Sequence, residues 1–220
     1  MTNFTFMKVI STNISEIKTI IFNDQEIETG IFKYGISEGI FLGDEDVKND
    51  SVVDRRYHGG IDKACYIYST DHYKYWQKLY PNLTFEWGMF GENLSIENLD
   101  EKDIYIGDIY QLGEAVVQIS QPREPCFKLG ARFDTPKVVK QFLDANFPGI
   151  YLRIIKKGKV VSGDEMLLIE SPEKKLTVIQ YYRTICDRTP NEEWKQLMLN
   201  SEFVRESKKE EIIKKSSRHH

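Results

Sequence analysis

A cysteine in a proline-rich loop is the residue of this sequence best suited to chemistry. The segment SQPREPCFKL follows directly on the β-branched run AVVQIS. Its two prolines restrict the backbone between the expected strand and Cys126. Arg123 and Lys128 lie three and two residues from the thiol, and positive charge favours the thiolate that ligates metals or attacks electrophiles. The competing interpretation is that Cys126 is a small buried hydrophobic residue, a common fate of free cysteine.

A second segment, DRRYHGGIDK at 54–63, combines paired glycines with basic residues. Gly59 and Gly60 would let the backbone approach a ligand closely and present successive N–H groups to an anion. The side chains of this segment that suit a phosphate or a pterin carbonyl are those of Arg55, Arg56, His58 and Lys63. The alternative is a tight turn with charged residues on the surface.

A third segment, FGENL at 90–94, offers the amide of Asn93 and the carboxylate of Glu92. It would equally serve as a turn into the next strand. The chain shows no GxGxxG, Walker loop, HExxH or GxSxG pattern, so dinucleotide, nucleotide and hydrolase motifs do not explain these three segments.

Composition excludes several classes of protein. With 30 basic and 34 acidic residues, the net charge of -4 argues against a nucleic-acid-binding protein. Cys65, Cys126 and Cys186 are odd in number and dispersed, which disfavours a disulfide framework, a structural zinc site and an iron–sulfur cluster. No secretory signal and no apolar run of about 18 residues is present. We therefore expect a cytoplasmic protein with no membrane segment.

The sequence pattern predicts mostly β-strands up to about residue 171, and these strands would position the three segments. Nine short β-branched or aromatic runs are separated by Gly, Asp and Asn, which is typical of a barrel or sandwich. They are 8–14, 19–23, 27–33, 64–69, 93–99, 103–113, 115–120, 151–158 and 166–171. Helices are expected over 70–80, with Thr70 as N-cap, and over 136–146, with Pro136 at its first position.

After residue 171 the pattern becomes helical. Helices are predicted over 175–183, 190–200 and 201–215, the second beginning at Pro190. Three short helices are too small for a core of their own. The fold class is therefore mainly β with α additions: a β-barrel domain over 1–171 followed by a three-helix segment over 172–216. The helices would pack on the barrel or on a second copy.

Taken together, these segments resemble the MOSC domain, named for the C-terminal part of molybdenum-cofactor sulfurases, and in particular its YiiM branch. The specific pieces are QPREPCFKL and HGGIDKA. They are supported by TGIFK, FGENLSIENL and YLRIIKKGKVVSGD, and the stretch from LTVIQYYRTI onward resembles the three-helix tail of YiiM-type members. One departure is the acidic insert EDVKNDSVVD between Gly43-Asp44 and Arg55, which predicts a differently shaped mouth on that side.

The resemblance implies a barrel whose mouth binds the molybdenum cofactor (molybdopterin), with Cys126 as metal ligand and catalytic residue. The cofactor-binding set expected from the three segments is His58, Gly59, Gly60, Lys63, Asn93, Ser120, Gln121 and Arg123. The implied activity is reduction of N-hydroxylated compounds such as 6-N-hydroxylaminopurine, a detoxification. Family members often form homodimers, so a homodimer is expected here.

Two other functions stay open at this point. One is a molybdopterin-binding or sulfur-carrier protein that uses Cys126 without reductase turnover. The other is a cysteine hydrolase, for which His58 is the candidate base. If the chain is a reductase, it has no dinucleotide or iron–sulfur motif with which to collect electrons. We therefore expect a separate electron-donating flavoprotein, attracted by Arg55, Arg56 and Lys63.

Overall fold

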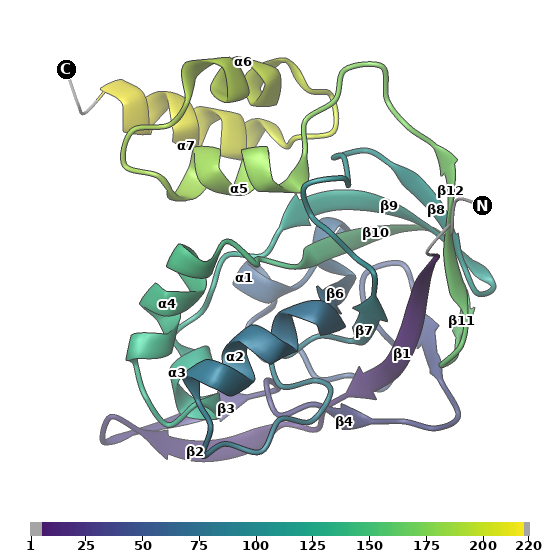
Figure 1. Ribbon diagram of the computed structural model, residues 1–220, viewed down its shortest axis with the longest axis vertical. Helices are drawn as coiled ribbons and strands as arrows, with labels where there is room; N and C mark the ends of the chain where they lie inside the picture. The colour runs from purple at the N-terminus through teal and green to yellow at the C-terminus, as the bar shows by residue number, and fades with distance from the viewer. Residues whose placement is uncertain (1–5, 218–220) are drawn as a thin grey trace.

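The computed structural model describes residues 6–217, apart from the side chains at positions 56, 57, 216 and 217. Seven strands of this part of the chain close into a barrel in the order β12-β8-β9-β10-β6-β7-β1, and β1 returns to pair with β12 (Figure 1). Only the β6–β7 pair among them is parallel. The strands are β1 (Met7–Ile14), β6 (Cys65–Ser69), β7 (Leu94–Glu97), β8 (Ile109–Leu112), β9 (Ala115–Pro122), β10 (Ile150–Lys156) and β12 (Glu165–Glu170).

Three smaller pairings surround the barrel. The two-residue β4 (Tyr34–Gly35) extends the sheet beside β1, and β5 (Ile40–Leu42) pairs with β11 (Gly158–Val160). The hairpin of β2 (Lys18–Phe22) and β3 (Gln25–Thr29) lies apart from the barrel. The expected barrel is thus confirmed, and β4, β5 and β11 are additions that their short length hid in the sequence.

Alternation along the strands separates two cores. In β6, Cys65 and Ile67 point into the barrel core, whereas Tyr66 and Tyr68 face an aromatic cluster on the outer side, because successive strand residues point to opposite faces. That cluster contains Trp76, whose indole N–H donates to the Tyr68 hydroxyl at 2.8 Å. The aromatic cluster therefore packs against the outer side of β6 and fixes the position of Tyr66.

Short helices fill the connections between strands. They are α1 (Arg55–His58), the 3-10 turns η1 (Ile61–Lys63) and η2 (Thr70–His72), α2 (Tyr73–Leu79), α3 (Lys128–Arg132) and α4 (Lys137–Ala145). The N-cap expected at Thr70 is wrong, since Ser69 precedes the 3-10 turn and no side chain caps it. Pro136 is the N-cap of α4 rather than its first helical residue.

The tail consists of α5 (Val178–Cys186), α6 (Glu192–Asn200) and α7 (Glu206–Ser217), which lie together at one end of the barrel (Figure 1). Two of the expected starts are wrong because capping side chains decide them. Thr177 forms a capping box with Gln180, and the Asn191 side chain accepts from the backbone N–H of Trp194, leaving Pro190 outside α6.

The third tail helix begins at Glu206, later than expected. Residues 201–205 turn instead, and this turn carries Phe203, whose ring lies against Gly107 so closely that a Cβ there would come within 2.6 Å. Val178, Tyr181, Met198, Val204 and Ile212 belong to the same hydrophobic cluster as the barrel interior. The tail therefore shares the barrel core, and the division into a barrel domain over 1–171 and a three-helix segment over 172–216 stays a prediction.

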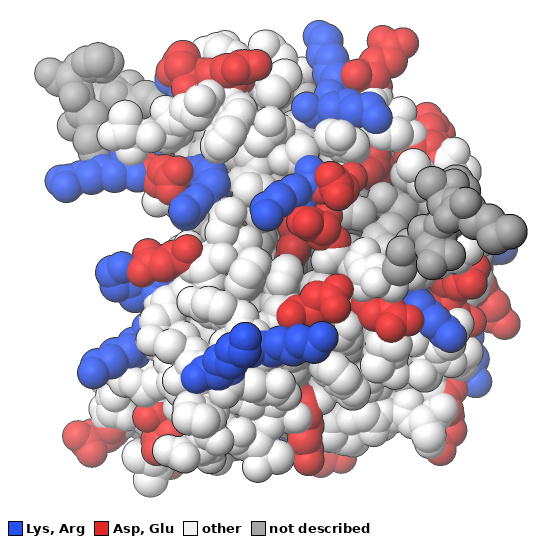
Figure 2. Space-filling model, in the orientation of Figure 1, with Lys and Arg blue, Asp and Glu red and all other residues white. Residues whose placement is uncertain are grey.

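Acidic and basic side chains are interspersed over the face in Figure 2, with no extended patch of one sign. Among the described helices, none is both long and apolar enough to span a membrane.

Candidate functional site

Two connected hollows meet at Cys126. The inner pocket comprises about 680 Å³, including the solvent at its opening, and is lined by Thr29, Lys33, Asp50, Asn93 and Tyr66 among others. The outer cleft is lined on its far side by Gln121, Glu124, Phe127, Arg205, Lys208 and Glu211. Both hollows share the side chains of Asp54, His58, Lys63, Cys126, Lys128 and Tyr151. The shared residues form the rim across which a ligand in one hollow reaches the other.

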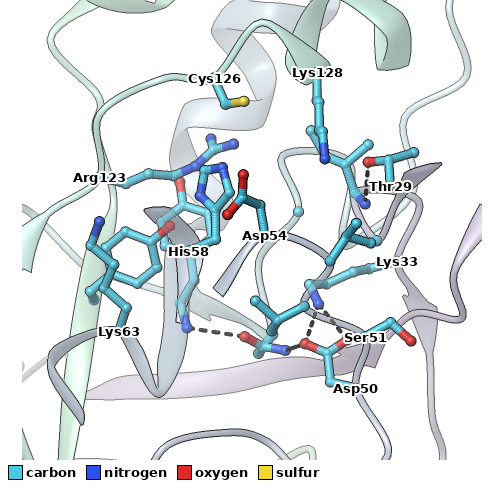
Figure 3. Close-up of a pocket in the computed structure, with 18 of the residues that line it drawn as sticks. Thr29, Lys33, Asp50, Ser51, Asp54, His58, Lys63, Arg123, Cys126 and Lys128 are labelled. Atoms are coloured by element: carbon cyan, nitrogen blue, oxygen red, sulfur yellow. Dashed lines mark hydrogen bonds and ion pairs between the residues drawn. The ribbon is translucent and has the colours of Figure 1, made fainter. Parts of the chain in front are cut away.

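Cys126 is held at this rim by the elements on either side of it. Strand β9 runs up to Pro122, and α3 begins two residues after the cysteine, with the Leu129 N–H donating to the Cys126 carbonyl at 2.9 Å. The Lys128 ammonium donates to the Glu28 carbonyl of β3 at 2.8 Å. Cys126 is half-buried and its sulfur lies at the top of the pocket, on the same side as Arg123 and Lys128 (Figure 3).

Arg123 is a buried cation in the wall of the inner pocket. It is 5% exposed, and its guanidinium lies 4.9 Å from the Tyr66 ring centroid and 5.5 Å from that of Phe142. Its Nη1 is buried with no hydrogen-bond partner among the described residues. A buried charged donor left unpaired is costly, so the arrangement suits an anionic group that supplies the missing acceptor.

His58 lies close to the positive charges of the pocket, and its pKa is shifted. Burial and, to a smaller extent, the nearby charges of Arg123, Lys63 and Lys128 together lower its pKa to about 4. The imidazole is therefore neutral at pH 7, while the pocket keeps its cationic side chains. A neutral ring between cations can accept or donate one hydrogen bond to a bound group.

Lys63 lies where the glycine loop meets the barrel. The backbone N–H of Lys63 donates to the Gly60 carbonyl at 2.8 Å. Gly60 has φ of 93°, a left-handed conformation that favours glycine. Burial lowers the pKa of Lys63, and Lys208 and Arg205 of the tail add to the effect. Gly59 and Gly60 do not line either hollow; they shape the turn that presents His58 and Lys63.

Asn93 lines the inner pocket, but its amide is engaged within the protein. Its oxygen accepts from the Tyr66 N–H at 3.1 Å, and its nitrogen donates to Asp50 at 2.8 Å and to the Asn13 carbonyl at 3.3 Å. Asp50 also accepts from the Lys33 ammonium, forming a buried ion pair. Asn93 thus anchors the wall of the inner pocket through these bonds, and a contact with cofactor stays a prediction.

Ser120 and Gln121 lie behind the rim. The Ser120 hydroxyl is within 2.6 Å of the Asp62 carbonyl and 2.8 Å of that of Tyr151, and Ser120 lines neither hollow. The Gln121 amide reaches the same Asp62 carbonyl at 3.4 Å and lines the outer cleft. Both residues hold β9 against the glycine loop, and their role as cofactor ligands stays a prediction.

Glu92 is fully buried, and its carboxylate accepts from the backbone N–H groups of Gly88 and Phe90 and from the hydroxyls of Ser95 and Tyr73. Burial raises its pKa. These bonds occupy the carboxylate, so the FGENL segment supplies a rigid turn beside the pocket.

The sequence did not reveal Asp62 or the tail as parts of the site. The buried Asp62 carboxylate binds Arg153 of β10, at 2.7 Å from its Nε, and Arg205, which precedes α7. Lys208 of α7 contacts Glu124 of the cysteine loop at 2.7 Å. An acidic residue inside a glycine-rich loop was visible in the sequence, but nothing local indicated its distant partners.

The other two thiols lie away from this site. Cys65 is fully buried, which raises its pKa, and burial raises the pKa of Cys186 to about 11. Within residues 6–217, no cluster of three or more His, Cys, Asp or Glu side chains is arranged to hold a metal ion. Cys126 is thus the thiol that faces the pocket.

The family profile of the MOSC domain matches residues 54–167. The chain belongs to the MOSC domain family. Its MOSC region contains His58, Lys63, Asn93, Arg123 and Cys126, whereas the outer-cleft residues of the tail lie beyond it.

Relatives with curated sequences support the assignment. The chain is 35% identical over 170 residues to the uncharacterized protein YflK of Bacillus subtilis, covering 77% of this chain and 76% of that protein. It is 35% identical over 152 residues to protein YiiM of Escherichia coli, covering 68% and 67%. A protein named "Reductase" from Gibberella moniliformis is 34% identical over 172 residues, which is 74% of this chain and 29% of that protein.

Solved structures extend the similarity to the MOSC fold with its tail. YiiM from Geobacillus stearothermophilus superimposes with a TM-score of 0.78 at 28% identity, covering 95% of this chain and 98% of that one. YiiM from Escherichia coli gives a TM-score of 0.71 at 23% identity, covering 97% and 92%, which shows the fold. The expected family and fold, a MOSC barrel followed by helices, are confirmed.

Proposed function

We propose that this chain is a molybdenum-cofactor-binding oxidoreductase that reduces N-hydroxylated compounds such as 6-N-hydroxylaminopurine. The observation that carries the proposal is the buried, unpartnered Nη1 of Arg123 beside a half-buried thiol at the mouth of a MOSC barrel. An anionic pterin phosphate supplies the acceptor that Arg123 lacks, and a thiolate is a suitable ligand for the metal. The reducing cytoplasm fits three free cysteines.

In this proposal Arg123 and Lys63 hold the anionic part of the cofactor, His58 contributes one neutral hydrogen bond, and Cys126 ligates molybdenum. When bound, the cofactor supplies the two-electron redox chemistry that removal of oxygen from an N–OH group needs. Reduction of N–OH to N–H also takes up two protons and releases water. Lys63, whose pKa is lowered by burial, holds a transferable proton at the rim shared by both hollows.

The decisive experiment is elemental analysis combined with pterin fluorescence on protein expressed with cofactor synthesis intact. We expect molybdenum and pterin in equal amounts. The loaded protein is then given 6-N-hydroxylaminopurine and a chemical reductant, and formation of adenine is measured. Metal with no adenine would favour the alternative, a molybdopterin-binding or sulfur-carrier protein. Protein that never acquires molybdenum would refute both.

Electrons would come from a separate flavoprotein that docks at the barrel mouth. Of the basic residues expected to attract it, Arg55 is paired with Asp46 at 2.6 Å and with Glu45 at 3.3 Å, both in the acidic insert. The Arg56 side chain lies outside the described residues. Steady turnover by the loaded protein with NADPH alone would contradict this proposal; turnover only after a flavin reductase is added would support it.

A further inference from the structure

The charges of the outer cleft nearly balance one another. Its charged lining consists of three acidic and four basic side chains, namely Asp54, Glu124 and Glu211 against Lys63, Lys128, Arg205 and Lys208. Lys208 lies 2.7 Å from Glu124 and 3.0 Å from Glu211, and Arg205 is paired with Asp62. Charge therefore gives this cleft no strong preference between an anionic, a cationic and a neutral ligand.

An exposed aromatic ring distinguishes the outer cleft from the inner pocket. Phe127 is 55% exposed, and it lines the outer cleft together with Cys126, which it follows in the chain. Among the described residues, Phe127 is the one exposed large hydrophobic side chain that lines either of the two hollows. The ring is therefore available to a molecule that lies beside the thiol.

The backbone that carries Phe127 is firmly held. Phe127 is the N-cap of α3 and has helical dihedral angles, and its carbonyl accepts from the Gly130 N–H at 2.8 Å. The helix is anchored by Leu129 and Phe133, which are buried in the aromatic cluster. Two residues before Phe127, Pro125 restricts the chain. A ring on so rigid a support loses little conformational entropy when a ligand stacks on it.

We infer that the outer cleft is the substrate site and that Phe127 determines its specificity, by stacking on the planar ring of an N-hydroxylated heteroaromatic compound. Because Cys126 lines both hollows, a cofactor in the inner pocket and a molecule stacked on Phe127 meet at the thiol. Stacking on an aromatic side chain favours any heteroaromatic ring, whereas a compound with an N–OH group but no ring lacks this contact. The inference rests on the proposed function for the reaction, but the stacking is a property of the cleft itself.

The first test measures binding. In the Phe127→Trp variant the indole reports on stacking, because a purine in contact with it quenches its fluorescence. Phe41→Trp is the matched control, since Phe41 is also exposed, at 41%, and lines neither hollow. 6-N-Hydroxylaminopurine is titrated into both variants and into wild-type protein, with and without cofactor. We expect saturable quenching above the wild-type background in Phe127→Trp alone; no such quenching, or equal quenching in both variants, would overturn the inference.

The second test measures turnover by loaded protein with a chemical reductant. Phe127→Ala should raise the KM for 6-N-hydroxylaminopurine by about tenfold, as loss of one base–aromatic stack does, and should leave kcat nearly unchanged. The KM for N-hydroxyurea, which has an N–OH group but no ring, should not change. Phe127→Trp should keep the low KM for the purine, and Phe41→Ala should change neither KM. Similar rises for both compounds, or no rise for the purine, would overturn the inference.

Together the two tests separate this inference from the proposed function. Stacking without reduction of the purine by loaded protein would leave the role of Phe127 standing and refute the reductase. Reduction with a purine KM that is unchanged by Phe127→Ala would support the reductase and refute the role of Phe127. A defect of Phe127→Ala that appears only when a flavin reductase supplies the electrons would place the ring in the docking surface for that partner, and would likewise overturn the inference.

Discussion

The carboxylate of Asp62 accepts a hydrogen bond from Arg205, a residue 143 positions later in the chain. Asp62 lies in the glycine loop, and its other partner is Arg153 of β10. Its backbone carbonyl is reached by Ser120 and Gln121 of β9. One buried residue therefore joins the loop that carries His58 and Lys63, the strand that leads to Cys126, and the tail.

Replacing Asp62 should destabilise the protein strongly. Asp62→Ala leaves Arg153 without its buried partner, and we expect the free energy of unfolding to fall by about 3 kcal/mol. Arg205→Ala should cost less, because the Arg205 side chain is 43% exposed. The measurement is urea unfolding, with Arg55→Ala, which breaks an exposed pair, as the control. A loss in Asp62→Ala no larger than that in Arg55→Ala would contradict the role of Asp62.

Cys126→Ser should fold and lose molybdenum, because a hydroxyl is a harder ligand and is not ionised at neutral pH. Cys186→Ser, at a thiol remote from both hollows, should retain the metal. Metal content per chain is measured by elemental analysis after expression with the cofactor supplied. Full occupancy in Cys126→Ser protein would show that the metal ligand lies elsewhere.

Arg123→Gln should weaken binding of an anion in the inner pocket by at least about tenfold, since a charge-assisted hydrogen bond is lost. The probe is inorganic phosphate, titrated calorimetrically into cofactor-free protein. Arg132→Gln is a matched control, because Arg132 also stacks on an aromatic ring, that of Phe32 at 5.0 Å, yet lines neither hollow. Similar losses in both variants would mean that the effect is general destabilisation.

The stability of the protein should depend on His58 between about pH 4 and 6.5. The folded pKa of about 4 lies below the ordinary value of 6.5, so the unfolded chain binds the proton more readily. Stability from the neutral ring is thus complete above pH 6.5 and is lost as the pH falls towards 4. His58→Asn should flatten the pH dependence of the free energy of unfolding in this window.

A bound anion should have the opposite effect on the same group. Phosphate in the inner pocket offsets the charges of Arg123, Lys63 and Lys128, so it should raise the pKa of His58. An NMR titration of the imidazole with and without phosphate measures this shift. A lowered or unchanged pKa in saturating phosphate would place the anion outside the inner pocket.

The sequence identifies features that are local. Prolines and cations around Cys126 predict a presented thiol, and Cys126 lines the pocket as this pattern predicts. The starts expected for two tail helices at residues 175 and 190 are wrong, because the side chains of Thr177 and Asn191 cap α5 and α6 at later positions.

Features that depend on distant pairing could not be predicted. Nothing local in the sequence indicates that Arg123 is buried; the pairing of Pro122 with Ile150 places it against Tyr66 and Phe142. Lys208 and Glu211 lie in the helix predicted over 201–215, and only the shared core places them at the cleft. No spacing in a single sequence records which distant segments meet.

The pairing of Met7 in β1 with Met166 in β12 has a consequence for biosynthesis. At typical translation speeds, roughly 10–30 s separate the emergence of these two strands from the ribosome. During that interval the β12-facing edge of β1 has no partner, and an open strand edge is a template for misassociation. The barrel can therefore close only after β12 has been synthesised, when translation is nearly complete.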